Sequence, residues 1–166
     1  MRFIPLSADD PAQIQRMSRL ATTIVKDYFD PLIGAAQNDY MIARFQTPDA
    51  IAAQLADGYV YFFAADDAGT PLGFLAYRIE PARLYLSKFY LHKHHRGKGY
   101  AHAMRDFVIQ AAVNAGLSHI ELNVYKHNDA TLAAYEALGF TRLRAEANDI
   151  GNGFVMDDYV YGLTVG

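Results

Sequence analysis

Residues 83–116 read RLYLSKFYLHKHHRGKGYAHAMRDFVIQAAVNAG, and this stretch decides the fold. Residues 83–91 are rich in strand-forming types, residues 92–99 are basic and contain two glycines, and the apolar residues that follow recur at helical spacing up to Gly116. The order predicts a strand, a glycine-rich turn and a helix in direct succession. Glycines let a ligand approach the backbone, and the first N–H groups of a helix favour an anion. The turn is therefore a candidate phosphate site, with a solvated basic turn as the alternative.

The chain before this stretch predicts a short strand, helices and a β-hairpin. Residues 1–6 favour a strand. Asp10 and Thr47 each precede a proline, which is the pattern of an N-cap followed by the first helical residue, and residues 38–45 are also predicted to be helical. Residues 59–65 and 72–80 are β-rich runs joined by turn-forming residues, and residues 83–91 are expected to close this antiparallel set.

The chain after Gly116 predicts a strand over residues 119–125 and a short helix capped by Asn128 or Asp129 that ends at Gly139. Two last strands, near residues 140–144 and 154–163, are expected to flank a loop over residues 148–153. The predicted fold class is α+β, with antiparallel strands first, then a β-α-β-α unit, then two strands, in a single domain over residues 1–166.

Composition narrows the classes of protein. The chain has 166 residues, 15 Lys+Arg against 18 Asp+Glu, and 0 Cys. This length fits one domain, and the lack of Cys excludes disulfides, Fe–S clusters and a thiol nucleophile. The near-neutral charge argues against a protein that coats nucleic acid or membranes, and neither a signal peptide nor an apolar run of about 20 residues is present. We expect a soluble, cytoplasmic protein with no nucleic-acid or membrane partner.

Two other phosphate-binding motifs fit the turn poorly. A P-loop requires G-x-x-x-x-G-K-S/T, but Gly99 is followed by Tyr100, and a dinucleotide fingerprint requires a third glycine where His102 stands. The histidines nearby have no Cys or carboxylate beside them to complete a ligand set, so no metal is expected.

The residues Arg96-Gly97-Lys98-Gly99-Tyr100-Ala101 resemble the acetyl-CoA loop Q/R-x-x-G-x-G/A of the GCN5-related N-acetyltransferase (GNAT) family. Residues 128–140, NDATLAAYEALGF, resemble the family's second block N-x-x-A-x-x-x-Y-E-x-x-G-F and depart from it at Thr131. The resemblance covers about residues 59–163. It implies a GNAT-like fold, a central mixed and mostly antiparallel sheet of about seven strands with helices on both faces. It also implies acetyl-CoA as co-substrate, no metal, and the homodimers that are common in the family.

The resemblance implies a role for each matching residue. The strand end at residues 89–91 would hold pantetheine and the acetyl carbonyl, with N–H groups near Tyr90 and Leu91 stabilising the oxyanion, and the turn would cradle the pyrophosphate. Tyr135 would protonate the leaving thiolate, although its spacing with Leu132 and Leu138 also fits a core aromatic. The residues so implied for cofactor binding are Phe89, Tyr90, Leu91, Arg96, Gly97, Lys98, Gly99, Tyr100, Ala101, His102, Asn128 and Tyr135.

A general base is harder to assign. Only about one amine molecule in 10³ to 10⁴ is unprotonated at pH 7, so a group must remove a proton before attack. Asn123 stands where a relative can carry Glu, and an amide cannot accept a proton at neutral pH. Glu121 shares a strand face with Asn123 and Glu80 precedes the third strand, so either carboxylate is a candidate, with a surface charge as the alternative.

The sequence therefore predicts an acetyl-CoA-dependent N-acetyltransferase that works by direct attack in a ternary complex, since without Cys no acetyl-cysteine can form. The alternative is a non-catalytic acyl-CoA-binding or sensing module.

The acceptor is predicted from charge placement. Asp157 and Asp158, together with Asn123 and Tyr40, favour a small cationic amine such as a polyamine, and Asp30 and Asp39 stand beside aromatic residues that could hold an ammonium. The ending MDDY at residues 156–159 resembles that of polyamine-acetylating members. Because strand residues alternate, at most one of Asp157 and Asp158 should face the acceptor. A protein N-terminal or amino-acid amine is the alternative substrate.

Overall fold

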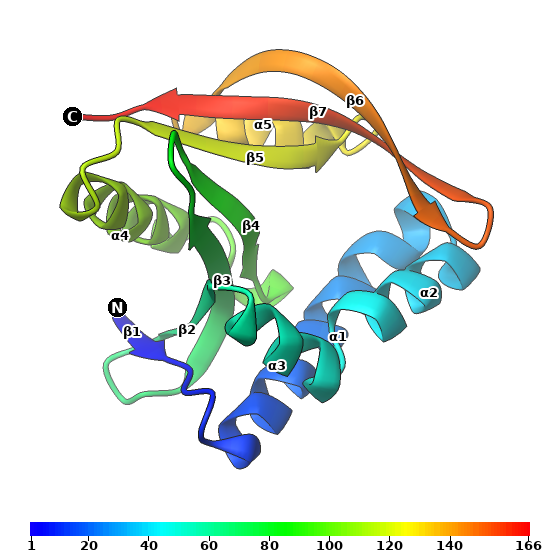
Figure 1. Ribbon diagram of the computed structural model, residues 1–166, viewed down its shortest axis with the longest axis horizontal. Helices are drawn as coiled ribbons and strands as arrows, with labels where there is room; N and C mark the ends of the chain where they lie inside the picture. The colour runs from blue at the N-terminus through cyan, green and yellow to red at the C-terminus, as the bar shows by residue number, and fades with distance from the viewer. The chain divides into compact units, whose positions relative to one another are not determined.

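The structure is a computed structural model that describes residues 1–166. Seven strands form one mixed sheet in the order β1-β2-β3-β4-β5-β7-β6, and five α-helices flank it (Figure 1). This confirms the predicted α+β class. The chain divides into two compact units, one made of Met1–Arg78 with Lys88–Met104 and the other of Ile79–Ser87 with Arg105–Gly166. None of the helices is long and apolar enough to cross a membrane.

Two helices of the first unit begin at the predicted caps. α1 (Pro11–Ile33) starts after Asp10, whose Oδ1 accepts a hydrogen bond from the Gln13 N–H at 3.2 Å. α3 (Pro48–Ala56) starts after Thr47, whose Oγ1 accepts from the Ala50 N–H at 3.1 Å. α2 (Ala35–Phe45) begins three residues before its predicted start, directly after Gly34. Each cap satisfies an N–H that the helix itself leaves without a partner.

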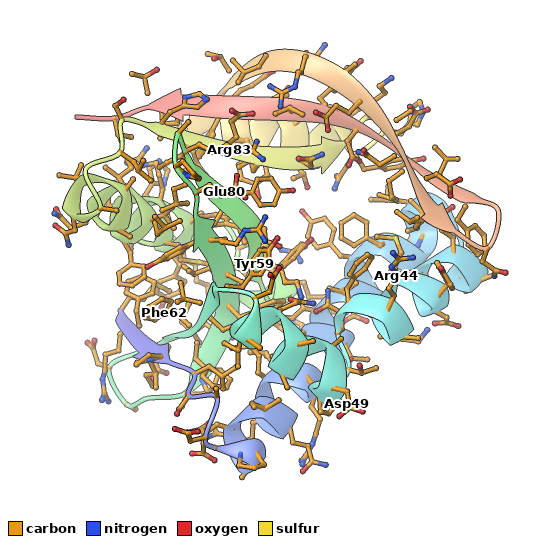
Figure 2. The ribbon with its side chains drawn as sticks, in the orientation of Figure 1. Arg44, Asp49, Tyr59, Phe62, Glu80 and Arg83 are labelled. Carbon is orange, nitrogen blue, oxygen red and sulfur yellow. The ribbon has the colours of Figure 1, made fainter.

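The strands of the first unit are antiparallel. β1 (Arg2–Pro5) pairs with β2 (Tyr59–Ala65), and β2 forms the predicted hairpin with β3 (Pro71–Ile79). The Arg78 guanidinium lies 4.6 Å from the centre of the Tyr59 ring, which Figure 2 labels on β2. Side chains of α1, α3, β2 and β3 form one apolar core, whose buried members are Leu6, Ile14, Met17, Ala21, Ile24, Ile51, Tyr61, Phe63, Phe74 and Ala76.

The second unit contains β5 (His119–Tyr125), α5 (Asp129–Ala137), β6 (Thr141–Gly151), β7 (Phe154–Thr164) and most of α4 (Tyr100–Asn114). β7 pairs with β5 and β6, antiparallel to both. The Tyr161 hydroxyl donates to Glu136 Oε1 of α5 at 2.9 Å, and Tyr161 stands opposite Leu122 across the β5–β7 ladder. The face of the sheet that carries Leu122 and Tyr161 is therefore the face that α5 covers.

The predicted loop over residues 148–153 is wrong. β6 continues to Gly151, and Asn148 and Asp149 stand opposite Met156 and Val155 of β7. Only Asn152 and Gly153 form the turn, with φ angles of 54° and 76°. Two successive residues with positive φ make the type I′ turn that joins twisted strands, and Asn-Gly is its preferred pair. Strand pairing therefore overrides the turn-forming residues that precede Asn152.

β4 (Leu84–Leu91) lies between β3 and β5 and is followed by a short 3₁₀ turn, η1 (Lys93–His95). β4 runs parallel to β5, the next strand after α4, so this pair belongs to the predicted β-α-β unit and makes the sheet mixed, as predicted. Their ladder consists of the pairs Leu84↔Ile120 and Tyr85↔Glu121. The pairing thus ends well before the last residues of β4, where the resemblance places the pantetheine contacts.

Candidate functional site

The glycine-rich loop has the geometry of an anion cradle. Gly97 and Gly99 adopt φ angles of 75° and 84°, and a Cβ built on either residue would meet no atom within 4 Å. The first helical hydrogen bond of α4 runs from the Ala103 N–H to the Gly99 carbonyl at 3.4 Å. The N–H groups of residues 100–102 therefore precede the helical ladder and are oriented as phosphate donors are.

Arg96 holds the start of this loop. Its Nε and Nη2 donate to the Leu91 carbonyl at 3.2 and 3.0 Å, and its guanidinium lies 4.2 Å from the centre of the Tyr28 ring on α1. The predicted cofactor residues Arg96 and Leu91 are thus in direct contact. Four histidines lie between positions 92 and 102, but no three His, Asp or Glu side chains of the chain are grouped so that they could hold a metal ion.

The end of β4 packs tightly against β3. A Cβ on Gly73 would lie 2.1 Å from the Tyr90 carbonyl oxygen and 2.9 Å from the Leu91 Cα, so only glycine allows this approach. The Tyr90 ring packs against the rings of Tyr28, Phe29 and Phe74, with centroids 5.4 to 6.3 Å apart. The backbone of the predicted oxyanion residues Tyr90 and Leu91 therefore lies directly against Gly73, and the ring of Tyr90 packs against the core of the first unit.

Tyr135 and Asn128 lie in the second unit, on α5 and at its start. Tyr135 is 9% exposed and its ring meets Phe140 edge-on, with centroids 5.6 Å apart. Asn128 is 4% exposed, and its Oδ1 accepts from the Thr131 N–H at 3.3 Å, which makes it the N-cap of α5. Asn128, which matches the Asn of the family's second block, therefore stabilises the start of α5 in this chain. The burial of Tyr135 is compatible with both of its predicted roles.

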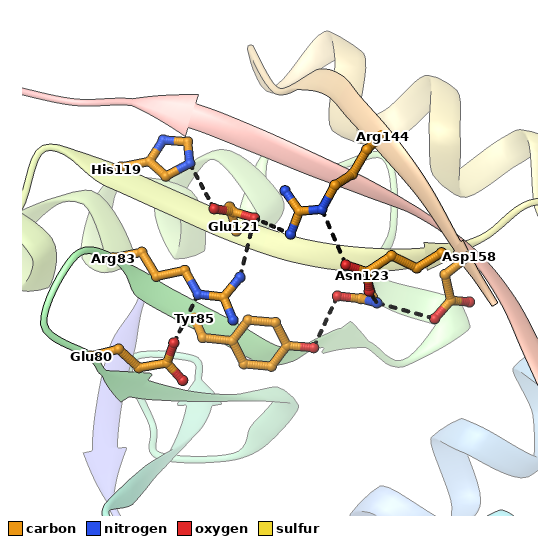
Figure 3. Close-up of polar contacts among 9 residues, drawn as sticks. Glu80, Arg83, Tyr85, His119, Glu121, Asn123, Arg144 and Asp158 are labelled. Atoms are coloured by element: carbon orange, nitrogen blue, oxygen red, sulfur yellow. Dashed lines mark hydrogen bonds and ion pairs between the residues drawn. The ribbon is translucent and has the colours of Figure 1, made fainter. Parts of the chain in front are cut away.

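Glu121 is bound by three neighbours on the same face of the second unit (Figure 3). Its Oε1 accepts from Arg83 Nη1 at 3.1 Å and from Arg144 Nη2 at 2.9 Å, and its Oε2 lies 3.0 Å from His119 Nε2. Burial by itself would raise the pKa of Glu121, but the hydrogen bond from Arg144, the charges of both arginines and the His119 contact lower it. Glu121 is consequently a weaker base than an ordinary glutamate.

The second candidate base is also paired. Glu80 Oε1 accepts from Arg83 Nε at 2.8 Å, and Figure 2 shows the two side chains together at the turn before β4. Arg83 therefore joins Glu80 to Glu121. Both carboxylates that the sequence indicates as bases carry an arginine partner.

Asn123 connects this ion-paired group to Asp158. Its Oδ1 accepts from the Tyr85 hydroxyl at 3.1 Å, while its Nδ2 donates to Asp158 Oδ2 at 3.3 Å and to Glu146 Oε2 at 3.5 Å (Figure 3). Tyr85, Arg83, Arg144, His119 and Glu146 were not identified from the sequence. Residue alternation along each strand places them on one face, but only strand pairing shows that they meet.

The other predicted acceptor residues lie apart from this group. Asp157 Oδ1 is 3.4 Å from Lys126 Nζ, and Asp157 alternates with Asp158 along β7. In the first unit, Asp30 and Asp39 both bind Lys26 Nζ, at 3.2 and 2.7 Å. A cation of the chain itself thus occupies the two aspartates that were expected to hold a substrate ammonium.

Tyr40, the predicted acceptor contact on α2, accepts from Arg44 Nη1 at 3.2 Å through its hydroxyl. Tyr28 is one of the aromatic residues near Asp30, and its ring face already carries the Arg96 guanidinium. Of the predicted acceptor residues, the structure therefore brings Asn123 and Asp158 together.

Lys88 was also missed, although its signal is readable in the sequence. Strand residues two positions apart share a face, so Lys88 lies on the same buried face of β4 as Leu84 and Leu86. Lys88 Nζ is 3.0 Å from the Phe45 carbonyl, 3.0 Å from Gln46 Oε1, 3.2 Å from Gln54 Oε1, and also bonds the Tyr61 hydroxyl. It closes the C-terminal end of α2, where partial negative charge accumulates.

The sequence profile described as the acetyltransferase (GNAT) family matches residues 22–140. A search of the curated proteins found no match.

Solved structures share the fold. The PaiA N-acetyltransferase of Thermoplasma acidophilum, solved with coenzyme A, has 14% identity, covers 99% of both chains and superposes with a TM-score of 0.77. A GCN5-related N-acetyltransferase of Rhodopseudomonas palustris has 16% identity, covers 99% of this chain and 95% of its own, with a TM-score of 0.76. A spermidine N-acetyltransferase SpeG chimera of Vibrio cholerae and hSSAT has 16% identity. It covers 99% of this chain and 96% of its own, with a TM-score of 0.67.

Proposed function

Because the chain belongs to the acetyltransferase (GNAT) family and is an acetyl-CoA-dependent acyltransferase, we propose that it acetylates the primary amine of a small molecule. The amine attacks acetyl-CoA directly in a ternary complex. We further propose that residues 1–166 act as one domain, since β4 and α4 each contribute residues to both compact units. The observation that carries the proposal is the loop at Gly97 and Gly99, which is open to a ligand and leads into the first amides of α4.

The residues of the loop fit a pyrophosphate. Two glycines with positive φ leave the backbone uncovered, and the N–H groups of Tyr100, Ala101 and His102 supply donors at a helix N-terminus. Lys98 adds a positive charge, and Arg96 keeps the loop attached to the Leu91 carbonyl. Together with the backbone of residues 89–91, these groups would bind the cofactor. Asn128 would contribute through the start of α5, which it caps.

The roles proposed for the residues follow from the cleavage of the thioester C–S bond of acetyl-CoA. Acetyl-CoA supplies an activated thioester, whose carbonyl oxygen gains negative charge when an amine adds to the carbon. Backbone N–H groups near Tyr90 and Leu91 would stabilise that charge, and Gly73 keeps this backbone in place. Tyr135 would give its phenolic proton to the thiolate.

For the acceptor we propose a small cation, with polyamines as the leading class. The support is the carboxylate of Asp158, which accepts from Asn123, together with a fold shared with a protein named as a spermidine N-acetyltransferase. Tyr40 and Asp157 are weaker candidates for acceptor contacts, since Arg44 and Lys126 already interact with them. An amino acid or a protein N-terminus remains the competing substrate class.

Thiol release from acetyl-CoA tests the proposal against a panel of spermidine, a monoamine, an amino acid and an N-terminal peptide. We expect release with the first two and fastest release with spermidine. Gly99→Asp should weaken acetyl-CoA binding at least about tenfold in calorimetry, because a carboxylate would stand where phosphate approaches. Unchanged affinity in a folded Gly99→Asp variant would contradict the loop assignment.

Tyr135→Phe tests the acid. This change keeps the packing against Phe140 and removes the proton, so kcat should fall on the order of 10²-fold with little change in acetyl-CoA affinity. Wild-type kcat in this variant, with chemistry rate-limiting, would leave Tyr135 as a core aromatic.

A further inference from the structure

Carboxylates gather on the face of the second unit that α5 does not cover. Glu80, Glu121 and Glu146 each bind an arginine, with N···O distances of 2.8 to 3.1 Å to Arg83 or Arg144 (Figure 3). These three acids share two arginines, so each of them has a cation partner within the protein. A fourth, Asp158, belongs to the same connected group through Asn123 and binds no cation.

Asp158 is buried and only half satisfied. The residue is 7% exposed, and its Oδ2 accepts from Asn123 Nδ2 at 3.3 Å. Its Oδ1 is buried and has no hydrogen-bond partner. A buried carboxylate oxygen without a donor is costly, and native structures rarely retain such an atom unless a water, an ion, a ligand or a proton completes it.

The groups around Asp158 keep it basic. Burial raises the pKa of Asp158, and the charges of Glu146 on β6 and Asp157 on β7 raise it further. The Asn123 hydrogen bond from β5 and the charge of Lys126 act in the opposite direction. Lys126 Nζ itself lies 3.4 Å from Asp157 Oδ1. The surroundings of Asp158 thus favour an added positive charge or proton.

The orientation of Asp158 is determined by two independent features. Asp158 is three residues from Tyr161, which faces α5, so alternation along β7 turns Asp158 to the opposite face. Asn123 has its own orientation set by the Tyr85 hydroxyl, which donates to Asn123 Oδ1 and leaves Nδ2 to bind Asp158 Oδ2. Oδ1 is therefore the oxygen of Asp158 that remains for a ligand.

We propose that Asp158 Oδ1 binds the ammonium group of the acceptor and removes its proton, as the general base of the reaction. This inference rests on the proposed function and replaces Glu121 and Glu80 as the base. The acceptor class that fits is an alkylammonium, because the four carboxylates of this group have only two arginines among them and Asp158 offers one buried oxygen without a donor.

The proton balance is complete. One proton passes from the ammonium to Asp158 Oδ1, and the freed lone pair forms the C–N bond with the acetyl carbon. The C–S bond breaks with its electron pair on sulfur, which takes the Tyr135 proton. The nitrogen loses a second proton to solvent as the amide forms, Tyr135 is reprotonated from solvent, and Asp158 releases its proton to solvent. One proton is released per turnover.

The test compares Asp158→Asn with Glu121→Gln, using spermidine, acetyl-CoA and the full chain between pH 6 and 10. Asp158→Asn keeps the shape and hydrogen bonding of the side chain but cannot accept a proton. We expect kcat/KM to fall on the order of 10²-fold at pH 7.5 with unchanged acetyl-CoA affinity. In this variant kcat/KM should rise about tenfold per pH unit, because only free amine can react, while the wild type and Glu121→Gln show a plateau.

Asp106→Asn is the matched control, since Asp106 is an exposed acid on α4 that pairs with Arg105. A plateau in Asp158→Asn at wild-type rate, or a sloping profile in Glu121→Gln alone, overturns the assignment to Asp158 and leaves the proposed function intact. Absence of thiol release by the wild type with every amine overturns the proposed function, and the base assignment with it. Circular dichroism of each variant verifies that it is folded.

Discussion

Lys88 in the first unit and Asp158 in the second are both 7% exposed, and neither forms an ion pair with an oppositely charged side chain. Their surroundings differ in one respect. Four oxygens contact Lys88 Nζ, whereas one oxygen of Asp158 has a donor and the other has none. The comparison teaches that burial of a charge does not indicate function by itself. The state of its hydrogen bonds separates a structural charge from one that can take a ligand.

Lys88 gathers segments that are distant in sequence. It joins the C-terminal end of α2 to Gln54 on α3 and Tyr61 on β2, and Gln54 Nε2 also donates to the Phe45 carbonyl at 3.0 Å. The side-chain nitrogens of Lys88 and Gln54 both donate to oxygens within this cluster. Lys88 therefore stabilises the fold of the first unit.

The largest expected effect is on stability. Lys88→Met would leave several buried oxygens without a donor, and we expect it to lower the free energy of unfolding by about 3 kcal/mol at pH 9. Urea denaturation followed by circular dichroism measures this. A loss below about 0.5 kcal/mol would mean that the four oxygens find other donors and that Lys88 is not a structural residue.

The pH dependence of stability sharpens the same point. Burial lowers the pKa of Lys88 to about 7 from its ordinary value of 10.5. Between these values the unfolded chain binds more protons than the folded one, so the free energy of unfolding rises with pH. Lys88 should contribute an increase of about 2 kcal/mol from pH 7 to pH 9, and Lys88→Met should lack it. Equal pH slopes in the two proteins would show that the oxygens offset the cost of burial.

Asp158 should behave in the opposite way. Because burial raises the pKa of Asp158, its charged form weakens the folded state at neutral pH, and protonation relieves this as the pH falls. Asp158→Asn removes the charge and retains the hydrogen-bonding shape, so its free energy of unfolding at pH 7 should equal or exceed that of the wild type. Thermal denaturation at pH 7 and pH 5 measures this, and a lower melting temperature at pH 7 would place Asp158 among the structural charges.

The smallest effect is expected at Lys26, the exposed counterpart of Lys88. Lys26 binds two aspartates, but its side chain is 46% exposed and water can replace both contacts. Lys26→Met should change the urea midpoint far less than Lys88→Met does. A comparable loss would mean that the connection between α1 and α2 depends on this ion pair.

Much of the fold could be read from local sequence. The caps at Asp10, Thr47 and Asn128, the β2–β3 hairpin and the loop at Gly97 all depend on residues within a few positions of one another. Such features can be predicted from a single sequence, because proline, glycine and capping side chains determine the conformation of the adjacent backbone. The extension of β6 to Gly151 could not be read in this way, since its pairing with β7 competes with local turn preferences.

The sequence by itself determined the class of fold, the phosphate-type loop and the candidate acid, because these follow from motif and spacing. Only the tertiary structure decided which acidic side chains already have a cationic partner within the protein. Glu121 and Asp158 are both acidic residues on predicted strands, and nothing local distinguishes them. Arg144 arrives from β6 to neutralise Glu121, while Asn123 meets only one oxygen of Asp158. The strength of a base depends on desolvation and on neighbouring charges, and chain folding brings those neighbours from distant positions.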